Sequence, residues 1–408
     1  MVNGWTKKFV QDYASLVTKG TTPTSIGLNF TDSGILFVKI ESIVNNKIDK
    51  NMCAFISSDT NLALSRSVLK ENDILVSIAG ALGRCAKVGN DILPANTNQA
   101  LAIIRLDDET ICIDYVFKYL QSEMIYKQIS EISVQGAQAN LSLENIKFLV
   151  IYLPTDITEQ RRIAAVLSDT DALIAAMEKL IAKKCAIKKG TMQELLTGKR
   201  RLSGFSDEWV EKKISDFGVV VTGATPSTSV AEYWNGNIPW VTPTDISVAK
   251  DIFTTERMIT ECGLSAIREL PTNTLLITCI ASIGKNTILK SIGASNQQIN
   301  AIIPKANYNV DFLYYLFEIN KSYLLGKAGQ TATNIISKQD FSEFIFTVPC
   351  SLPEQIAIAS ILSDMDAEID MLTAKLNKLR NIKQGMMSEL LTGHIRLPEN
   401  EDIKNGEN

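Results

Sequence analysis

Residues 159–202 contain Glu159-Gln160, Leu167-Ser168-Asp169-x-Asp171, Gly190, Glu194-Leu195-Leu196-Thr197-Gly198 and Arg201-Leu202. Each segment recurs 195 residues later, as Glu354-Gln355, Leu362-Ser363-Asp364-x-Asp366, Gly385, Glu389-Leu390-Leu391-Thr392-Gly393 and Arg396-Leu397. Chance does not place so many matches at one offset, so the chain contains an internal duplication.

Weaker matches upstream extend the duplication to the rest of the chain. The offset drifts there, as insertions in loops would cause. The paired segments are Gly20-x-Thr22-Pro23 with Gly223-x-Thr225-Pro226, Val38 with Val241, Gly83-Arg84 with Gly284-Lys285, and Asn98-Gln99 with Gln297-Gln298. The chain therefore consists of two similar units, each followed by a similar segment.

Each repeat ends in a predicted long helix. Thr158 and Asp156 supply N-cap chemistry, and no proline follows before Gly198. Apolar residues step by threes and fours at Leu362, Met365, Ile369, Leu372, Leu376, Leu379, Met386 and Leu390, and in the same phase at Leu167, Ile174, Met177, Ile181 and Leu195. This spacing predicts an antiparallel coiled coil with pseudo-two-fold symmetry. A helix of about 40 residues spans about 60 Å, which favours a spacer.

The segments before the helices have the pattern of mixed α/β units. Short β-branched runs predict strands at 35–40, 73–78, 101–104, 149–152, 273–278, 301–303 and 344–348, with helices at 115–120 and 312–316. We expect an α+β chain with mixed α/β domains at 1–154 and 202–349. Helical spacers are expected at 155–201 and 350–397, and a disordered acidic tail at 398–408.

Composition excludes several classes of protein. The 408 residues are 45% hydrophobic and 21% charged, which suits two or three cores. No apolar run reaches roughly 18 residues and the N-terminus lacks a signal-peptide core, so we expect a cytoplasmic protein without a membrane partner. The seven cysteines form no CxxC motif and His394 is the single histidine, which disfavours metal sites and Ser-His-Asp triads. A net charge of −4 disfavours a protein that coats nucleic acid unaided.

The sequence contains no catalytic or cofactor-binding motif. The segments Gly80-x-x-Gly83-Arg84 and Ser282-Ile283-Gly284-Lys285 resemble phosphate loops only loosely, because Cys279 stands where a P-loop needs glycine. GxGxxG, HExxH and EF-hand patterns are absent, as is the Asn/Asp-Pro-Pro-aromatic pattern of amino-group methylation. We therefore expect a non-catalytic chain that binds no metal or cofactor.

Polar loops are the remaining candidates for a binding site. Amide, hydroxyl and basic side chains read base edges or hold phosphates. The candidate DNA-contacting residues are Lys39, Arg84, Asn98, Gln99, Gln135, Gln138, Asn140, Thr242, Thr244, Lys285, Gln297, Gln298, Gln330, Thr331 and Asn334. The alternative interpretation is that these loops are solvated turns and that the Gly-x-Thr-Pro segments serve only to form a turn, in which proline fixes φ after a glycine.

The helices carry a second set of candidates. Residues 158–201 hold ten basic and five acidic side chains, an excess that the second helix lacks. This pattern indicates either a solvated face or a basic face directed at DNA or an acidic partner. The candidate partner-binding residues are Asp169, Asp171, Glu194, Leu195, Asp364, Asp366, Glu389 and Leu390.

Together these segments resemble the specificity subunit of Type I DNA restriction-modification systems, over essentially the whole chain. The resemblance rests on Leu153-Pro154 and Val348-Pro349, on Glu159-Gln160-x-x-Ile163 and Glu354-Gln355-x-x-Ile358, and on the Leu-Ser-Asp-x-Asp and Glu-Leu-Leu-Thr-Gly segments. Residues 240–246 (Trp-Val-Thr-Pro-Thr-Asp-Ile) and 282–285 are typical of that family's target recognition domains. The first unit departs from this pattern. It has Phe37 and Lys39 where the second unit has Trp240 and Thr242, and it has no equivalent of Asp245.

The resemblance implies a protein with no activity of its own. Such a subunit binds double-stranded DNA, two methyltransferase (M) subunits and, for cleavage, ATP-dependent restriction (R) translocase-nuclease subunits. Each recognition domain would read one half of a split target in the major groove, and the helices would set the gap. The S-adenosylmethionine, ATP and Mg are expected on partner subunits, into which the target adenines would be flipped.

Two other functions stay open from the sequence alone. A non-enzymatic scaffold would join two protein partners without DNA readout, and then a changed 135–140 loop would leave DNA affinity unaltered. An enzyme with a cryptic site would turn over substrate as an isolated chain. The single histidine and the lack of a cofactor loop disfavour the enzyme.

Overall fold

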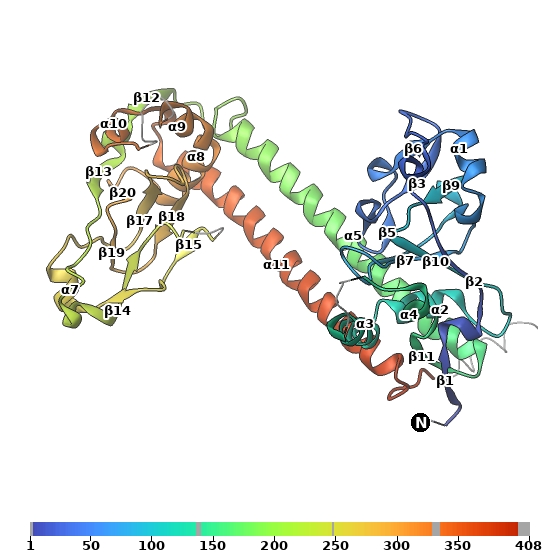
Figure 1. The fold of residues 1–408 in the computed structure, drawn as a ribbon. Helices are drawn as coiled ribbons and strands as arrows, with labels where there is room; N and C mark the ends of the chain where they lie inside the picture. The colour runs from blue at the N-terminus through green and yellow to red at the C-terminus, as the bar shows by residue number, and fades with distance from the viewer. Residues whose placement is uncertain (1–2, 136–139, 247–248, 329–334, 399–408) are drawn as a thin grey trace, which may run out of the picture. The chain divides into compact units, whose positions relative to one another are not determined.

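The computed structural model describes residues 3–135, 140–246, 249–328 and 335–398 (Figure 1). The chain divides into two compact units: unit 1 comprises residues 1–177 and 375–408, and unit 2 comprises residues 178–374. Each unit combines an α/β domain with the beginning of one long helix and the end of the other. The predicted helical spacers are therefore each divided between the two units, and the predicted tail beyond Pro398 lies outside the described residues.

The first repeat contains eleven strands and five α-helices within the described residues. They are β1 (Trp5–Phe9), β2 (Ala14–Lys19), β3 (Ile35–Val38), β4 (Ile43–Val44), β5 (Lys47–Ile48), β6 (Ala54–Ile56), α1 (Ser58–Ala63), β7 (Ile74–Ser77), β8 (Cys85–Lys87), β9 (Ala95–Thr97), β10 (Leu101–Leu106), α2 (Ile113–Leu120), α3 (Glu123–Gln135), α4 (Leu143–Lys147), β11 (Val150–Pro154) and α5 (Ile157–Leu195).

The second repeat follows the same general order of elements. They are β12 (Trp209–Lys213), α6 (Ile214–Phe217), β13 (Gly218–Thr222), β14 (Trp234–Val241), β15 (Asp251–Ile252), β16 (Met258–Ile259), α7 (Glu261–Ser265), β17 (Thr274–Thr278), β18 (Asn286–Leu289), β19 (Ala294–Ser295), β20 (Ile299–Pro304), α8 (Val310–Ile319), α9 (Lys321–Ala328), α10 (Lys338–Glu343), β21 (Ile345–Pro349) and α11 (Leu352–Leu390).

The central sheet has the same topology in both units. Its strand order is β2-β10-β7-β8 in unit 1 and β13-β20-β17-β18 in unit 2, where β15 extends the edge. A smaller sheet has the order β6-β3-β9 or β16-β14-β19, and the first and last strands of each domain pair as β1-β11 and β12-β21. The predicted strands and helices are confirmed, and the shared strand order confirms the duplication.

The central strands are covered on both faces. In β7, Ile74 and Val76 pack in the cluster that contains α2 and the ends of the long helices, whereas Leu75 packs on the side of β3 and β9. In β17 the same division separates Leu275 from Leu276. Successive side chains of a strand point to opposite faces, so a strand buried on both sides needs an unbroken apolar run. This requirement explains the apolar runs in the sequence.

The helices α5 and α11 pack antiparallel within each unit. In unit 1, Glu159 near the start of α5 pairs with Arg396 just beyond the end of α11, and Asp171 further along α5 pairs with Lys383 of α11, so the two helices run in opposite directions. The corresponding pairs in unit 2 are Lys184–Glu368, Lys188–Asp366 and Arg201–Glu354. All the predicted seam residues are buried or half-buried. The antiparallel pairing is confirmed within each unit, whereas the pseudo-two-fold symmetry stays a prediction.

A glycine three residues beyond the end of each long helix faces a tryptophan. Gly198 and Gly393 have φ values of 69° and 73°, the left-handed conformation common just beyond a helix C-terminus. A Cβ on Gly393 would lie 2.8 Å from the Trp5 ring, and one on Gly198 would lie 3.4 Å from Trp209. Both the backbone and the packing therefore favour glycine at the predicted helix ends.

A buried carboxylate at the start of each long helix pairs with an arginine beyond the end of the other. The Glu159 side chain is 2% exposed and accepts hydrogen bonds from Nε and Nη2 of Arg396 at 2.9 and 2.6 Å. The Glu354 side chain is 0% exposed and accepts from Nε and Nη2 of Arg201 at 2.7 and 2.9 Å. We call each pair a Glu–Arg clamp. An unpaired buried carboxylate costs several kcal/mol, so each clamp couples a helix start to a helix end.

The glutamine beside each clamp ties the helix to its α/β domain. Gln160 accepts a hydrogen bond from the Cys112 backbone N–H at 2.8 Å and donates to the Pro154 carbonyl at 2.9 Å. Gln355 makes the same two bonds, to the backbone before α8 and at the end of β21. The repeated Glu-Gln pair therefore joins strand, domain helix and long helix in each unit.

Arg201→Met should destabilise unit 2 by about 3–5 kcal/mol, because it leaves the Glu354 carboxylate buried without its partner. Adding Glu354→Gln should recover part of that loss, since a neutral amide is less costly to bury than a charge. Urea unfolding followed by tryptophan fluorescence measures both changes. As a control, Lys213→Met removes the exposed Lys213–Glu343 pair and should change little. Equal losses from Arg201→Met and Lys213→Met would contradict the clamp.

Candidate nucleic-acid interface

Four loops meet at one end of the central sheet in each unit, and many of the predicted DNA-contacting residues lie on them. They are the Gly-x-Thr-Pro turn, the turn after β3 or β14, the tip of the β7–β8 or β17–β18 hairpin, and the loop before β10 or β20. We call this set the loop cluster. It comprises residues 20–23, 39–42, 78–84 and 98–100 in unit 1, and 223–226, 242–245, 279–285 and 296–298 in unit 2.

Glutamine side chains anchor the Gly-x-Thr-Pro turns. In unit 1, Oε1 of Gln99 accepts hydrogen bonds from the backbone N–H and the hydroxyl of Thr22, at 3.0 and 2.5 Å. In unit 2, the Thr225 hydroxyl donates to Oε1 of Gln297 at 2.7 Å. Both glutamines are exposed, and their side-chain NH2 groups make no hydrogen bond to the part of the chain that the structure describes. These groups are therefore available as donors to a ligand.

Strand pairing corrects one predicted equivalence. In the parallel pairs β3–β9 and β14–β19, Val38 lies opposite Thr97 and Val241 lies opposite Ser295. Residues 97–99 (Thr-Asn-Gln) thus correspond to 295–297 (Ser-Asn-Gln), and the predicted match of 98–99 with 297–298 was one residue out. Asn296 was missed as a candidate, although aligning Thr-Asn-Gln with Ser-Asn-Gln would have found it.

The two asparagines of these segments have the same structural role. The side-chain oxygens of Asn98 and Asn296 each accept from the backbone N–H two residues further on, at 3.1 Å. The Asn296 amide also donates to Oε1 of Gln298 at 3.0 Å. Both asparagines therefore shape their loops, and the half-buried Gln298 has its oxygen occupied within the loop.

Arg84 and Lys285 occupy equivalent positions at the hairpin tips. Their backbone N–H groups donate to the hydroxyls of Ser77 and Thr278 at 2.9 and 3.1 Å, and both basic side chains are exposed. In each unit a backbone hydrogen bond of 2.9 Å joins the hairpin to the loop before the next strand. Each loop cluster therefore presents a cation beside exposed amide groups.

The turn after β3 or β14 is closed by its fourth residue. The backbone N–H and hydroxyl of Thr242 donate to Oδ2 of Asp245 at 2.8 and 2.7 Å, and the hydroxyls of Thr242 and Thr244 are 2.7 Å apart. In unit 1 the Lys39 backbone N–H donates to the Ser42 hydroxyl at 3.2 Å. Ser42 thus fills the position for which the sequence shows no second aspartate.

The predicted amide-rich loops are described only in part. Gln135 is the last residue of α3, and Gln138, Gln330, Thr331 and Asn334 lie outside the described residues. Asn140 is exposed, and the next residue donates its backbone N–H to the hairpin at 2.8 Å. The equivalent bond in unit 2 joins Ile336 to Cys279 at 2.9 Å. The described residues that follow the two segments are therefore bonded to the loop cluster.

Six of the eight helix candidates fall into three groups. Leu195 and Leu390 are 1% and 4% exposed inside the two cores, which corrects their predicted role as partner contacts. Asp169 and Asp364 are exposed. Glu194 pairs with Arg200 at 3.1 Å, and Glu389 lies 3.6 Å from His394. Partner binding by the four acidic residues stays a prediction.

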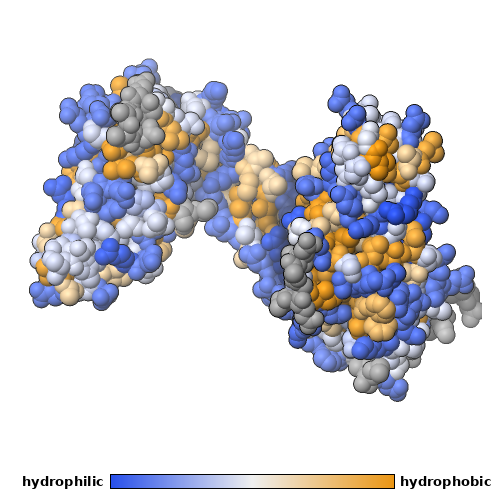
Figure 2. Space-filling view, viewed as in Figure 1, coloured by the Kyte–Doolittle hydropathy of each residue, from blue (hydrophilic) through white to orange (hydrophobic). Residues whose placement is uncertain are grey.

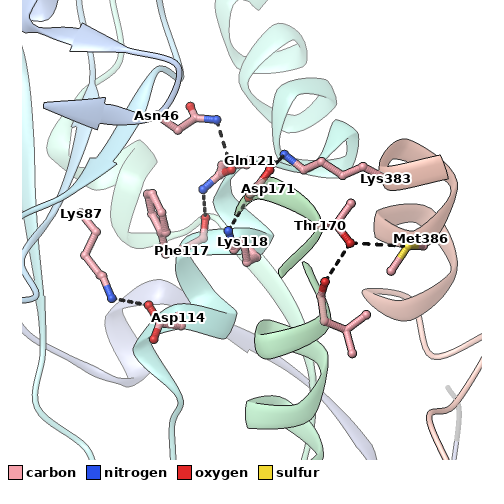
Figure 3. Close-up of polar contacts among 11 residues, drawn as sticks. Asn46, Lys87, Asp114, Phe117, Lys118, Gln121, Thr170, Asp171, Lys383 and Met386 are labelled. Carbon is pink, nitrogen blue, oxygen red and sulfur yellow. Dashed lines mark hydrogen bonds and ion pairs between the residues drawn. The ribbon is translucent and has the colours of Figure 1, made fainter. Parts of the chain in front are cut away.

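Asp171 lies between two lysines from different elements (Figure 3). Lys118 of α2 and Lys383 of α11 bind its carboxylate at 2.5 and 2.6 Å. Burial alone would raise the pKa of Asp171, but its bonds to the two lysines lower that pKa overall. Asp171 therefore fastens the α/β domain of unit 1 to both long helices.

Asp366 has the corresponding place in unit 2. Its carboxylate accepts a hydrogen bond from the Tyr315 hydroxyl of α8 at 2.6 Å and pairs with Lys188 of α5. The domain helix supplies a lysine in unit 1 and a tyrosine in unit 2. The long helix supplies a lysine in both units, Lys383 in unit 1 and Lys188 in unit 2. Asp171 and Asp366 are thus engaged within the chain, and a contact of either with a partner stays a prediction.

Asp171→Asn should destabilise unit 1 by about 1–3 kcal/mol at pH 7, because it removes charge-assisted hydrogen bonds. The folded state lowers the pKa of Asp171, so this stability is present above the unfolded pKa of about 3.9 and is lost as pH falls through the folded pKa. The advantage of the wild type should therefore shrink below roughly pH 4. Thermal unfolding of the two proteins across pH measures the difference, with Asp169→Asn as an exposed control. A difference that is constant down to pH 3 would contradict an ionic role.

The described residues hold no group of three or more His, Cys, Asp or Glu side chains placed to bind a metal ion. The buried thiols Cys85 and Cys279 are poor nucleophiles, because burial raises the pKa of each to about 12. The loop cluster therefore offers hydrogen-bond donors, hydrogen-bond acceptors and exposed cations.

Two glycines allow the loops to approach one another closely. A Cβ on Gly20 would lie 1.8 Å from the Thr97 carbonyl oxygen, and one on Gly223 would lie 2.2 Å from the Asn296 carbonyl oxygen. Real Cβ atoms do not come so near to backbone. The Gly-x-Thr-Pro turns therefore require glycine at their first position.

Gly223→Ala should displace the turn and destabilise unit 2 by at least about 1–3 kcal/mol, the usual cost of overpacking. The control Gly190→Ala adds a methyl group in open space on α5 and should be neutral or stabilise by up to about 1 kcal/mol. Urea unfolding followed by tryptophan fluorescence compares the two. A Gly223→Ala protein as stable as the wild type would show that the close approach is not required.

Comparisons with known proteins agree with this geometry. The family model described as "Type I restriction modification DNA specificity domain" matches residues 3–183 and 206–381. The type I restriction enzyme MjaIX specificity subunit of Methanocaldococcus jannaschii is 37% identical over 172 residues, 40% of this chain and 39% of that protein. The Escherichia coli EcoR124I/EcoR124II specificity subunit is 27% identical over 206 residues, 48% and 50% of the two chains. This chain thus aligns with half or less of the length of these two relatives.

One relative matches over nearly its whole length. The putative type I restriction enzyme MjaX specificity subunit of M. jannaschii is 25% identical over 416 residues, 96% of this chain and 94% of that protein.

Solved structures share the fold. A chain from a structural study of type I R-M complex assembly and conformational transition has a TM-score of 0.61 at 17% identity, over 96% of this chain and 99% of that chain. The S subunit of a type I restriction-modification system from M. genitalium has a TM-score of 0.60 at 14% identity, over 96% and 97% of the two chains. At these identities the likeness concerns the fold alone.

Proposed function

Because this chain belongs to the family of type I restriction-modification DNA specificity domains, we propose that its two α/β domains read the two halves of a split double-stranded DNA target. The proposal includes directing adenine methylation by two partner methyltransferase subunits and cleavage by partner translocase-nuclease subunits. The chain is a non-catalytic specificity subunit, as the names of its relatives indicate.

The duplicated loop cluster is the observation that carries this proposal. Both units build it with equivalent backbone bonds, yet the side chains differ: Lys39 corresponds to Thr242, and Ala100 corresponds to Gln298. Base pairs are distinguished by their pattern of donors and acceptors in the major groove. One frame carrying two sets of hydrogen-bonding groups suits the reading of two different half-sites.

Basic side chains near the cluster supply phosphate contacts under this proposal. Besides Arg84 and Lys285, the exposed Arg66 lies beside the first Gly-x-Thr-Pro turn, with Nη2 3.4 Å from the Lys19 carbonyl and the Thr21 hydroxyl. Phosphate contacts position a protein without reading sequence. With a net charge of −4, the chain would depend on partner subunits for much of the positive field around DNA.

Helix α5 offers a surface for a protein partner. In the part of α5 that belongs to unit 2, Leu180 and Ile187 are exposed and seven residues apart, so they lie on nearly the same face of the helix. Figure 2 shows apolar surface on the helical part of the chain. Exposed apolar side chains are stabilised when a partner covers them, so we propose that an apolar helix of a methyltransferase subunit packs here.

The proposal assigns no cofactor to this chain. S-adenosylmethionine, ATP and Mg would be bound by the partner subunits, and the target adenine would be flipped into the methyltransferase. Among the described residues, the helices include none with the length and apolar character needed to cross a membrane.

Methylation mapping tests the proposal. The chain is co-expressed with its companion methyltransferase in a host without adenine methylation, and genomic DNA is sequenced with detection of N6-methyladenine. A split, asymmetric motif methylated on both strands is expected. A complex that assembles but methylates no motif would favour the scaffold.

Paired variants then assign the halves. Lys285→Ala with Gln297→Ala should weaken or relax one half only, and Arg84→Ala with Gln99→Ala the other, at about 1–3 kcal/mol per lost base contact. Gln193→Ala, an exposed change on α5, is the control and should leave the motif intact. A change in both halves from either pair would contradict separate reading.

A further inference from the structure

An aromatic pair beside the unit 2 loop cluster holds an arginine. The rings of Trp234 and Trp240 meet edge to face, with centroids 5.1 Å apart and an interplanar angle of 87°. The guanidinium carbon of Arg257 lies 3.9 Å from the Trp234 centroid and 5.0 Å from the Trp240 centroid. At these distances both rings attract the cation and restrict its side chain.

This arginine adjoins two loops of the cluster. The Trp240 indole N–H donates to the Ala224 carbonyl at 2.9 Å, inside the Gly-x-Thr-Pro turn. The backbone N–H of Glu256 donates to Oδ1 of Asp245 at 3.0 Å, in the turn after β14. Arg257 is therefore held at the proposed DNA surface.

The Arg257 guanidinium is oriented but has no polar partner. Its side chain is exposed, and within the described ranges of the chain it makes neither a hydrogen bond nor an ion pair. Contact with the Trp234 ring leaves N–H groups of the guanidinium free to bind a ligand. An arginine already held in one orientation loses less conformational entropy on binding than a mobile one.

The surroundings favour a base over a phosphate as that ligand. Arg257 and Glu256 both line an open hollow of about 360 Å³. The Glu256 carboxylate would repel a phosphate there. A guanine presents two neutral acceptors, N7 and O6, whose spacing matches the arginine fork.

Unit 1 carries a similar aromatic pair with a different cation. The centroids of Phe30 and Phe37 are 5.4 Å apart at 74°, and Nζ of Lys39 lies 4.3 Å from the Phe30 centroid. Phe37 corresponds to Trp240, because each precedes the equivalent valine of its strand. A lysine is a point charge without a planar fork, so the two units offer different chemistry at this place.

We propose that Arg257 is a specificity-determining residue that reads a guanine in the half-site recognised by unit 2. This inference rests on the proposed function and deepens it by naming the base and the reading side chain. It predicts a G·C pair in that half that depends on the guanidinium.

The test compares Arg257→Lys and Arg257→Gln in the full chain assembled with its methyltransferase. Arg257→Lys keeps the charge but loses the fork, so it should relax one G·C position in the unit 2 half and lower methylation of the wild-type motif about 5- to 150-fold. Arg257→Gln should have at least as large an effect. Lys305→Gln, which removes a charge at the opposite end of β20, should leave the motif unchanged. Assembly with the methyltransferase checks that each variant is folded.

Binding to modified DNA gives a second measurement. Replacing the implicated guanine with 7-deazaguanine removes the N7 acceptor, so it should weaken binding by the wild-type complex and weaken Arg257→Gln no further. Equal weakening of both would overturn the assigned contact.

The other outcomes separate the two proposals. No motif from the assembled wild-type complex would be a failure of the proposed function itself. A motif without a G·C pair in the unit 2 half would overturn only the role of Arg257. An unchanged motif, with uniformly weaker binding and a salt slope reduced by about one, would identify a phosphate contact and also overturn it.

Discussion

The Glu–Arg clamp is the interaction on which the rest of this structure depends. Glu159 and Glu354 are buried at the starts of the long helices, where an unpaired carboxylate would be costly. The neutralising arginines follow the ends of the opposite helices. Each unit is therefore completed by a chain segment from the other repeat, and the antiparallel arrangement follows from electrostatics as well as from the apolar seam. The coupled residues in unit 1 are 237 positions apart, so much of the chain must be in place before either clamp can close.

In each loop cluster, the groups that hold the loops in place differ from the exposed side chains that are proposed to read DNA. Backbone hydrogen bonds, the glycine close approaches and the buried strands hold the loops in both units, while several exposed side chains take no part in that support. Lys39 and Thr242 sit at the same place in the frame with their backbone N–H groups held in the same way. A change of such a side chain alters the donors and acceptors on the surface without disturbing the core below it. This division allows one architecture to present two different sets of donors and acceptors, as the proposed reading of two half-sites requires.

Regular features were predictable from the sequence, and context-dependent features were not. The strands and both long helices follow from apolar periodicity, and the helix ends follow from repeated glycines. The clamp was not predicted, because a glutamate in the first turn of a helix is usually a solvated residue that favours the helix dipole. The loop register was misplaced at Gln297 and Gln298, where two adjacent glutamines fit either alignment. Arg257 was missed because its counterpart in the first repeat is the uncharged Ala54, so the duplication does not mark the position, and only the fold brings the arginine onto the two tryptophans.

Two equivalent aspartates, Asp171 and Asp366, join each α/β domain to the long helices. Asp171 and Asp366 each bind one group from a domain helix and a lysine from the opposite long helix. The lysine is retained in both units, whereas the domain group is an amine in one and a phenol in the other. The partner from the long helix is thus a lysine in both units, whereas the partner from the α/β domain differs between them. Two domains of different sequence thus dock on equivalent carboxylates, because the helix of each supplies a donor there, and the lysine of the long helix is unchanged.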